Sequence, residues 1–247
     1  MQMEVFEDGA AVARRAAAVI AENARQAVSQ RGKFVMAVSG GKTPWAMLRD
    51  LAEQQIPWGK VHVFQIDERI APAGDPDRNL SHLRESLLSH APLKLDQIHA
   101  MPVESANLEA SAAEYLATLK DFAGNPPVLD LAHLGMGPDG HTASLIPHDP
   151  VLDVTDRDIG LTGVYQGRRR MTMTYPLLNR SRLILFLITG AEKAPMLQLL
   201  CKADPSIPSG RIRGNSMLLL ADKAAAGRAG GWGLSQAIRT KVYPDCT

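Results

Sequence analysis

The chain has 247 residues, 45% hydrophobic and 21% charged, a composition that argues against intrinsic disorder. Its 27 Lys and Arg are balanced by 26 Asp and Glu, giving a net charge of +1. With no basic excess to neutralise phosphates, we expect neither a nucleic-acid partner nor a membrane-surface partner. The sequence contains no run of 18 apolar residues, so it predicts no membrane-spanning helix.

Targeting and metal-binding signals are lacking in the sequence. Residues 1–9 contain three acidic side chains and lack the basic-then-apolar pattern of a secretion signal. Two cysteines, Cys201 and Cys246, form neither a disulfide framework nor a metal-binding spacing, and no HExxH motif occurs. We therefore expect free thiols in the cytoplasm, and neither a metal nor another cofactor.

Helical and strand-like patterns alternate along the chain. In chain order they predict a helix over 10–30, a strand over 33–39, a helix over 44–54, a strand over 61–67, helices over 79–89 and 108–122, a strand over 129–134, a half-buried strand over 171–175, a fully buried strand over 183–189, a helix over 192–201, and a strand over 217–221 followed by a short helix. The glycine-rich segment 227–233 is predicted at the surface. Strands separated by helices indicate an α/β fold with a mostly parallel sheet. Without a long polar linker, we expect one domain over 1–247.

Three polar segments follow predicted strands: Ser39–Pro44, Asp67–Arg69 and Gly135–Thr142. Ligands of open parallel sheets bind where the carboxyl ends of the strands meet. We therefore expect these three segments to converge on one site.

The first segment has the composition of a phosphate-binding loop. Ser39, Gly40 and Gly41 stand between a strand and a helix, and glycines let the backbone N–H groups of a helix start approach an anion. Lys42 and the hydroxyl of Thr43 could add contacts. The structural alternative is a tight turn in which Thr43 caps the helix. The segment is not a Walker A loop, because Met36 stands where its first glycine is required.

The second segment places two carboxylates and a guanidinium at the end of a strand. Arg69 could hold a phosphate or an oxyanion, and Asp67 could act as an acid or a base. Alternatively, Asp67 and Glu68 pair with Arg69 or cap a helix. Spacing alone leaves both interpretations open.

The third segment contains a GxGxxG pattern, but Asp139 within it would oppose a pyrophosphate, and no acidic strand end follows about 20 residues later. A dinucleotide site is therefore not expected. The informative residue is His141, which lies in this glycine-rich turn beside Asp139 and can take a proton from water near neutral pH. A histidine in this position favours a functional role over a structural one. Because the sequence has no motif for a nucleophilic side chain, this histidine predicts either direct attack by water or proton transfer on a sugar.

The same residues resemble the 6-phosphogluconolactonases, which share a superfamily with the glucosamine-6-phosphate deaminases. The run from Leu134 to Pro147 is similar to the family signature almost throughout. Lys42 stands where a serine is commoner in the glycine loop, and Arg78 replaces a usual serine. Further matches are Asp67–Arg69, Asp77–Asn79, Arg170–Thr174, Asn179 and Gly190–Ala194, and the resemblance covers roughly 10–226.

The resemblance implies a Rossmann-like three-layer αβα sandwich that hydrolyses 6-phospho-D-glucono-1,5-lactone to 6-phosphogluconate. It implies that His141 is the general base, with Asp139 orienting it or tuning its pKa. Asp67, which could act as an acid or a base by its own chemistry, is kept as a catalytic candidate beside them. The residues that the resemblance implies for the phosphate and the developing oxyanion are Ser39, Gly40, Gly41, Lys42, Thr43, Arg69, Arg170 and Lys193. Lys42 and Arg78 are both expected to add positive charge near the phosphate.

Two alternatives remain open. The deaminases carry Asp-Glu-Tyr where this chain has Asp67–Arg69, and a glutamate where it has Ile146. Because Ile146 cannot polarise a histidine, the lactonase is favoured. A non-catalytic sugar-phosphate sensor would keep the cradle without the chemistry, but the intact Asp139 and His141 argue against it.

Overall fold

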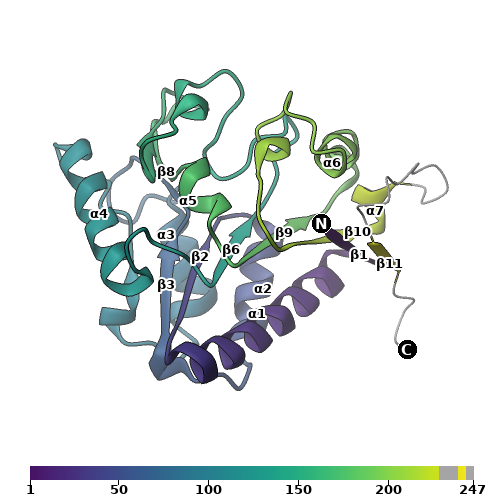
Figure 1. Cartoon of the computed structure of the whole chain (residues 1–247), viewed down its shortest axis with the longest axis horizontal. Helices are drawn as coiled ribbons and strands as arrows, with labels where there is room; N and C mark the ends of the chain where they lie inside the picture. The colour runs from purple at the N-terminus through teal and green to yellow at the C-terminus, as the bar shows by residue number, and fades with distance from the viewer. Residues whose placement is uncertain (228–238, 243–247) are drawn as a thin grey trace.

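The computed structural model describes residues 1–227 and 239–242 (Figure 1). Its main sheet has the order β11-β1-β10-β9-β6-β2-β3-β5. Each adjacent pair in this sheet is parallel, which confirms the predicted α/β fold. The strands are β1 (Gln2–Phe6), β2 (Phe34–Val38), β3 (Val61–Gln65), β5 (Ile98–His99), β6 (Leu131–Leu134), β9 (Leu183–Ile188), β10 (Met217–Asp222) and β11 (Arg239–Val242).

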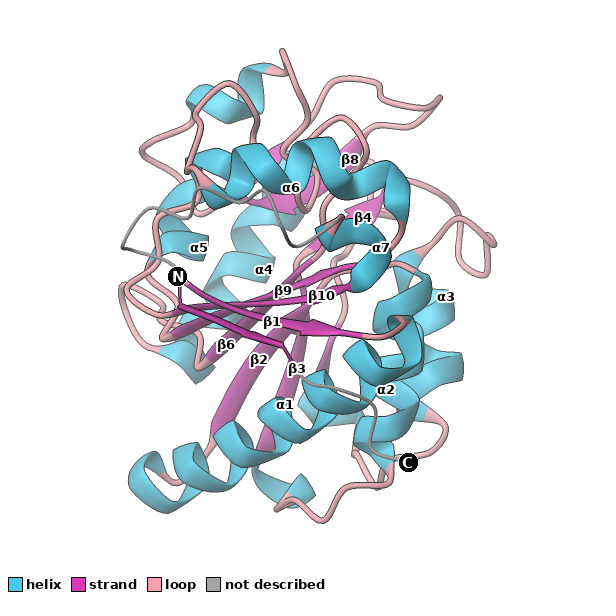
Figure 2. Cartoon of the chain, turned by 90° about the vertical axis from the view of Figure 1, so that its right-hand side faces the viewer, coloured by secondary structure: helices cyan, strands magenta, loops and turns pink. Residues whose placement is uncertain are grey.

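Helices cover both faces of the sheet, as Figures 1 and 2 show. One face carries α1 (Gly9–Arg31), α2 (Lys42–Ala52) and α3 (Asn79–Leu83), and the other carries α4 (Leu108–Ala123), α5 (Tyr175–Asn179), α6 (Ala194–Cys201) and α7 (Lys223–Ala226). Buried side chains form a separate cluster on each face. Along β9, Ile184 and Phe186 belong to one cluster and Leu185 and Leu187 to the other. This arrangement is the expected three-layer sandwich.

The ends of the long helices follow from local sequence signals. The carboxylate of Asp8 accepts a hydrogen bond from the backbone N–H of Ala11 at 2.8 Å and caps the start of α1. Gly32, with φ of 76°, ends the same helix in the left-handed conformation that glycine tolerates. Asn107 caps α4 in the same way as Asp8 caps α1.

A second, antiparallel sheet has the order β4-β8-β7 and lies over the carboxyl edge of the main sheet (Figure 2). Its strands are β4 (Asp67–Arg69), β7 (Ile159–Leu161) and β8 (Arg170–Met173). The prediction that 61–67 is one strand was wrong, because β3 ends at Gln65 and the chain changes sheets at Ile66. The half-burial predicted for 171–175 was also wrong, because all five residues are buried, the first three of them in β8.

Several shorter elements were not predicted. β1 pairs with both β10 and β11, and β5 and β7 are only two and three residues long. The helix over 79–89 continues beyond α3 as a π-helical turn (Arg84–Leu88), and the helix over 192–201 begins as a 3₁₀ turn (Ala191–Lys193). Further 3₁₀ turns are Trp58–Lys60, Leu95–Gln97, Pro150–Asp153 and Ser209–Arg211.

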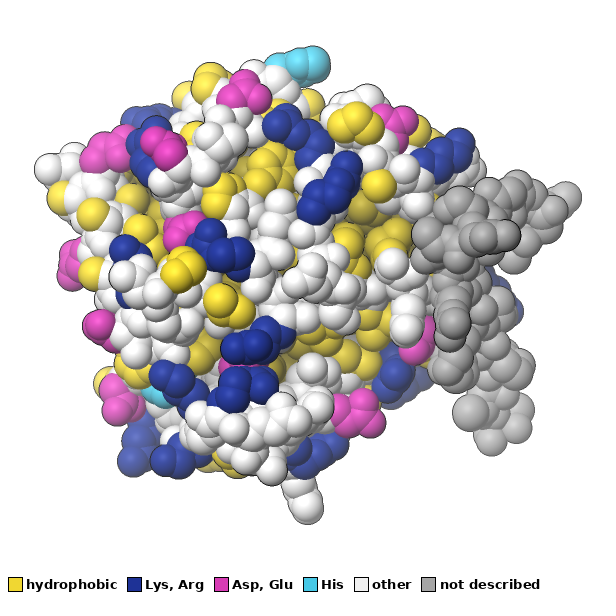
Figure 3. Space-filling model, in the orientation of Figure 1, with side chains coloured by type: hydrophobic (Ala, Val, Ile, Leu, Met, Phe, Trp, Pro, Cys, Tyr) yellow, Lys and Arg dark blue, Asp and Glu magenta, His cyan; other side chains and the backbone are white. Residues whose placement is uncertain are grey.

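Some expectations concern the surface and the C-terminal segment. Apart from exposed Gly227, the segment 227–233 lies outside the described residues, as does Cys246. Cys201 is a free thiol. On the face that Figure 3 shows, Lys and Arg side chains are interspersed with acidic and apolar ones. Among the described residues, each helix is too short or too polar to cross a bilayer.

Candidate active site

A cavity of about 370 Å³ opens at the carboxyl edge of the main sheet, beyond the ends of β2, β6 and β9. Parts of all three polar segments line it, so their predicted convergence is confirmed. The predicted site residues that line it are Ser39, Gly40, Gly41, Lys42, Thr43, Asp67, Arg69, His141, Arg170 and Lys193. Asp139 is not among the lining residues, but it contacts His141, which is one of them.

The glycine loop brings the start of α2 to the cavity. A Cβ on Gly40 would lie 2.1 Å from Oδ1 of Asn79, so only glycine allows this close approach. Gly41 is the N-cap of α2 and offers no capping side chain, which leaves the positive end of the helix open toward an anion. The alternative in which Thr43 caps the helix was wrong, because Thr43 lies inside α2 and its hydroxyl pairs with that of Thr189 at 2.7 Å.

Four cationic side chains reach the cavity, and the guanidinium groups of Arg69 and Arg170 make hydrogen bonds there. Arg69 donates from Nη1 to Oδ1 of Asn79 and to the backbone carbonyl of Asp77, both at 2.8 Å. Burial and the neighbouring charge of Arg69 lower the pKa of Arg170. Within the part of the chain that the structure describes, the ammonium groups of Lys42 and Lys193 make no hydrogen bond or ion pair.

The alternation of side chains along β4 places them on two opposite sides of the strand. Asp67 and Arg69 face the cavity, while Glu68 points to the opposite side of the strand. Asp67 is only 4% exposed, and its two carboxylate oxygens accept hydrogen bonds from the hydroxyls of Ser39 at 2.9 Å and Ser144 at 2.7 Å. The carboxylate therefore ties the glycine loop to the turn that carries His141.

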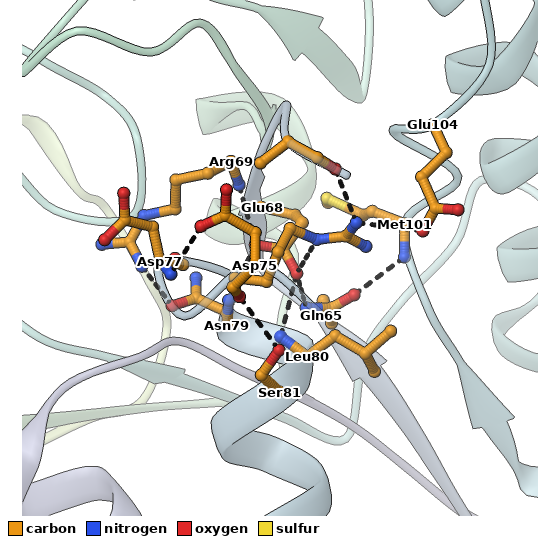
Figure 4. Close-up of polar contacts among 12 residues, drawn as sticks. Gln65, Glu68, Arg69, Asp75, Asp77, Asn79, Leu80, Ser81, Met101 and Glu104 are labelled. Carbon is orange, nitrogen blue, oxygen red and sulfur yellow. Dashed lines mark hydrogen bonds and ion pairs between the residues drawn. The ribbon is translucent and has the colours of Figure 1, made fainter. Parts of the chain in front are cut away.

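Glu68 is the centre of a buried polar cluster behind the cavity (Figure 4). Its carboxylate accepts from the backbone N–H groups of Asn79 and Leu80 at the start of α3, which is the helix-capping alternative considered for this segment. Arg78 lies 3.1 Å from the same carboxylate, and both side chains are nearly inaccessible to solvent. Arg78 is not among the cavity-lining residues, so the expectation that it adds charge near a phosphate was wrong. Its ion-pair partners are Glu68 and Glu104, and it also donates to the backbone carbonyl of Ala71 at 2.9 Å.

His141 and Asp139 are in direct contact. Nδ1 of His141 lies 2.6 Å from Oδ1 of Asp139, and the backbone N–H of His141 donates to the same oxygen at 3.2 Å. Burial raises the pKa of Asp139, but the charge of His141 and its hydrogen bonds outweigh this effect, and the pKa is lowered overall. The contact occupies Nδ1, which leaves Nε2 of the imidazole for the cavity.

The glycine-rich turn explains why two residues separated by one can touch. The N–H of Gly140 donates to the carbonyl of Gly137 at 3.0 Å, and the N–H of Gly137 donates to the carbonyl of His141 at 2.8 Å. Gly140 has φ of 81°, a left-handed conformation that folds the side chains of Asp139 and His141 to the same side.

Sequence reasoning did not assign several residues that the structure places at the site. Asn79 was noted only as part of a matching block, yet it holds Arg69 and lines the cavity. Thr189 and Glu192 come from the end of β9 and the turn after it. Tyr165 lies 26 residues from Asp139 in the chain and contacts its carboxylate, and no local motif marks it.

Comparison with known proteins places this architecture in a family. The family model for glucosamine-6-phosphate isomerases/6-phosphogluconolactonase matches residues 7–220. A 6-phosphogluconolactonase from Nostoc sp. is 38% identical over 232 residues, covering 91% of this chain and 96% of the relative. One from Synechocystis sp. is 40% identical and covers 78% and 81% of the two chains. The crystal structure of a 6-phosphogluconolactonase from Thermotoga maritima matches with a TM-score of 0.79 and 28% identity, covering 90% of this chain and 99% of the other.

Fold and cavity together define an α/β protein with a cavity lined by four cationic side chains at the carboxyl edge of a parallel sheet. The chain belongs to the glucosamine-6-phosphate isomerase/6-phosphogluconolactonase family. The resemblance inferred from the motifs is thereby confirmed.

Proposed function

We propose that this chain hydrolyses 6-phospho-D-glucono-1,5-lactone to 6-phosphogluconate, a step of the oxidative pentose phosphate pathway. The observation that carries the proposal is the imidazole of His141, held by Asp139 at the wall of a cationic cavity. The names of the curated relatives, which include 6-phosphogluconolactonases from cyanobacteria and mycobacteria, support the same reaction.

The cavity suits a dianionic phosphate. Its lining contains the four cations Lys42, Arg69, Arg170 and Lys193, against the two carboxylates Asp67 and Glu192. Together with the open N-terminus of α2, these groups can hold the phosphate and stabilise an oxyanion through charge-assisted hydrogen bonds. Ser39 and Asp67 remain in the proposed site, Asp67 as a member of the catalytic set beside the substrate.

His141 supplies the proton transfers. With Nδ1–H donated to Asp139, Nε2 takes a proton from water as the water oxygen bonds to C1 of the lactone. The carbonyl electrons move to the oxygen, and the tetrahedral intermediate collapses with cleavage of the C1–O5 bond. The proton on Nε2 then passes to O5, which becomes the hydroxyl of the product.

The test is a coupled assay in which glucose-6-phosphate dehydrogenase generates the lactone and 6-phosphogluconate dehydrogenase reports the product as NADPH. The variant His141→Ala should lose about 10²- to 10⁴-fold in kcat, the usual contribution of a general base. His90→Gln, a change at an exposed histidine outside the cavity, is the matched control and should retain wild-type kcat. A wild-type kcat in His141→Ala would contradict the proposed mechanism.

Lys193→Met tests the assignment of the phosphate. Loss of one charge-assisted contact should raise KM for the phosphorylated lactone by roughly tenfold to a hundredfold and leave KM for unphosphorylated glucono-1,5-lactone within about twofold. Lys202→Met, at an exposed lysine outside the cavity lining, is the control. Equal changes of KM for both lactones would remove Lys193 from the phosphate site.

Release of ammonia from glucosamine 6-phosphate is the assay for the alternative deaminase activity. Ile146, which stands where the deaminases carry a glutamate, is 4% exposed and does not line the cavity. We therefore expect no ammonia above background. A cytoplasmic location and the lack of a nucleic-acid partner stay predictions.

A further inference from the structure

The hairpin between β7 and β8 contacts the turn that carries Asp139 and His141. Its tip is closed by two backbone hydrogen bonds between Tyr165 and Arg168, at 2.9 and 3.2 Å. The two residues between them, Gln166 and Gly167, have φ of 52° and 78°, the pattern of a tight two-residue hairpin turn. Tyr165 is therefore presented from a short, well-defined turn.

Three carboxylates fix this hairpin over the site. The backbone N–H of Gly163 donates to Asp149 at 2.9 Å, and the guanidinium of Arg168 donates to Asp75 at 2.8 Å. The phenol of Tyr165 donates to Oδ2 of Asp139 at 3.0 Å. The hairpin is thus connected to the loop after β4 and to the turn that carries His141.

The two oxygens of Asp139 have different partners. Oδ1 faces Nδ1 of His141, and Oδ2 accepts from the phenol of Tyr165. The rings of Tyr165 and His141 also meet edge to face, with centroids 5.6 Å apart, and the guanidinium of Arg170 lies 5.0 Å from the centre of the Tyr165 ring. Tyr165 therefore contacts the orienting carboxylate, the imidazole and one of the site arginines.

We propose that Tyr165 is a positioning residue of the hydrolytic site, and that it acts on His141 through the carboxylate of Asp139. The proposal rests on the proposed function. The terminal torsion of an aspartate is broad, and both contacts with His141, from Nδ1 and from the backbone N–H, reach only Oδ1. The hydrogen bond from Tyr165 fixes the second oxygen, Oδ2, and with it the plane of the carboxylate. A fixed carboxylate holds the proton of His141 on Nδ1 and keeps the lone pair of Nε2 directed at the water.

Tyr165→Phe removes the phenol oxygen and keeps the ring. We expect kcat to fall by about fivefold to tenfold, which corresponds to one hydrogen bond, with KM within about twofold of wild type. The control is Tyr175→Phe, which deletes a phenol that donates to the backbone carbonyl of Pro208 at 2.9 Å, in the core rather than at Asp139. The control should keep wild-type kcat even if it is less stable.

Nitrogen-15 NMR of the imidazole gives a readout that does not depend on turnover. At a pH where the imidazole is neutral, wild type should hold His141 as the Nδ1–H tautomer, and Tyr165→Phe should shift the population toward Nε2–H. Tyr175→Phe should leave the tautomer unchanged. In an Asp139→Ala background, Tyr165→Phe should have no further effect on the tautomer, because the carboxylate that it acts through is gone.

The outcomes separate this inference from the proposed function. A wild type that does not hydrolyse the lactone would overturn the proposed function, while the tautomer populations would still decide whether Tyr165 positions His141. An unchanged tautomer in Tyr165→Phe would overturn the inference, and a fall of kcat without a tautomer change would assign the effect to Arg170. Wild-type kcat in Tyr165→Phe would likewise overturn the role in hydrolysis.

Discussion

At the scale of single residues, the environment of each histidine decides its chemistry. His141 lies at a cavity wall with 21% of its side chain exposed and one nitrogen held by a carboxylate. His133 lies on β6 beneath the glycine loop, fully buried, and its Nδ1 accepts the backbone N–H of Ser39 at 3.3 Å. Burial lowers the pKa of His133 to about 3. The same side chain is thus the proposed proton carrier in one place and a neutral core residue in the other.

The pKa of His133 predicts loss of stability in acid. In the unfolded chain the imidazole has a pKa near 6.5, so between about pH 6.5 and 3 the unfolded state binds more protons than the folded state. The contribution of this group to the free energy of unfolding is therefore fully present above pH 6.5. Well below pH 6.5 it falls by about 1.4 kcal/mol for each unit of pH. Urea unfolding of His133→Gln at pH 7 and 5 should show a smaller difference than wild type. The exposed control His90→Gln should keep the wild-type difference, and equal differences in all three proteins would contradict this account.

At the scale of elements, sequence periodicity predicted the long helices and buried strands well. α1 was predicted over 10–30 and forms over Gly9–Arg31, because an alanine-rich run is bounded by a capping aspartate and a glycine. β4 could not be assigned, because three residues carry no periodicity and their partner, β8, is about 100 residues away in the chain. The burial of Arg78 could not be predicted either, because it depends on the side chain of Glu68 pointing away from the cavity and toward Arg78.

The buried ion pair behind β4 should be sensitive to loss of one partner. Arg78→Met leaves the carboxylate of Glu68 buried without its counter-ion and should lower the free energy of unfolding by about 3–5 kcal/mol in urea titrations. The matched control is Arg168→Met, which removes a partly exposed pair with Asp75 and should lower it by less than about 1 kcal/mol. Equal losses in the two variants would mean that burial of the Arg78 pair has no energetic weight.

At the scale of the whole molecule, two apolar layers share one sheet. The fold class and the layer order followed from the alternation of strands and helices, and the edge that carries the site followed from where the polar segments stand. The small sheet beside the cavity could not be predicted in this way, because it is built from strands that are distant in the sequence. We propose that residues 1–247 form one domain, because the two apolar clusters meet through the same strands.

Neighbouring residues of β9 test this coupling, because they point into different layers. Leu185→Ala and Phe186→Ala should each lower the free energy of unfolding by about 3 kcal/mol and Tm by roughly 6–12 °C. Calorimetry should show a single transition that moves as a whole in both variants. Two transitions, each shifted by only one of the variants, would show that the layers unfold separately.

The register of the small sheet has a consequence for binding. Arg69 on β4 and Arg170 on β8 are directly paired across antiparallel strands, a position where like charges repel. The strand pairing therefore places two positive charges side by side at the cavity wall. In the proposed function, a doubly charged phosphate bound between the two guanidinium groups would act as their counter-ion, and part of its affinity would arise from the relief of a repulsion that the fold imposes.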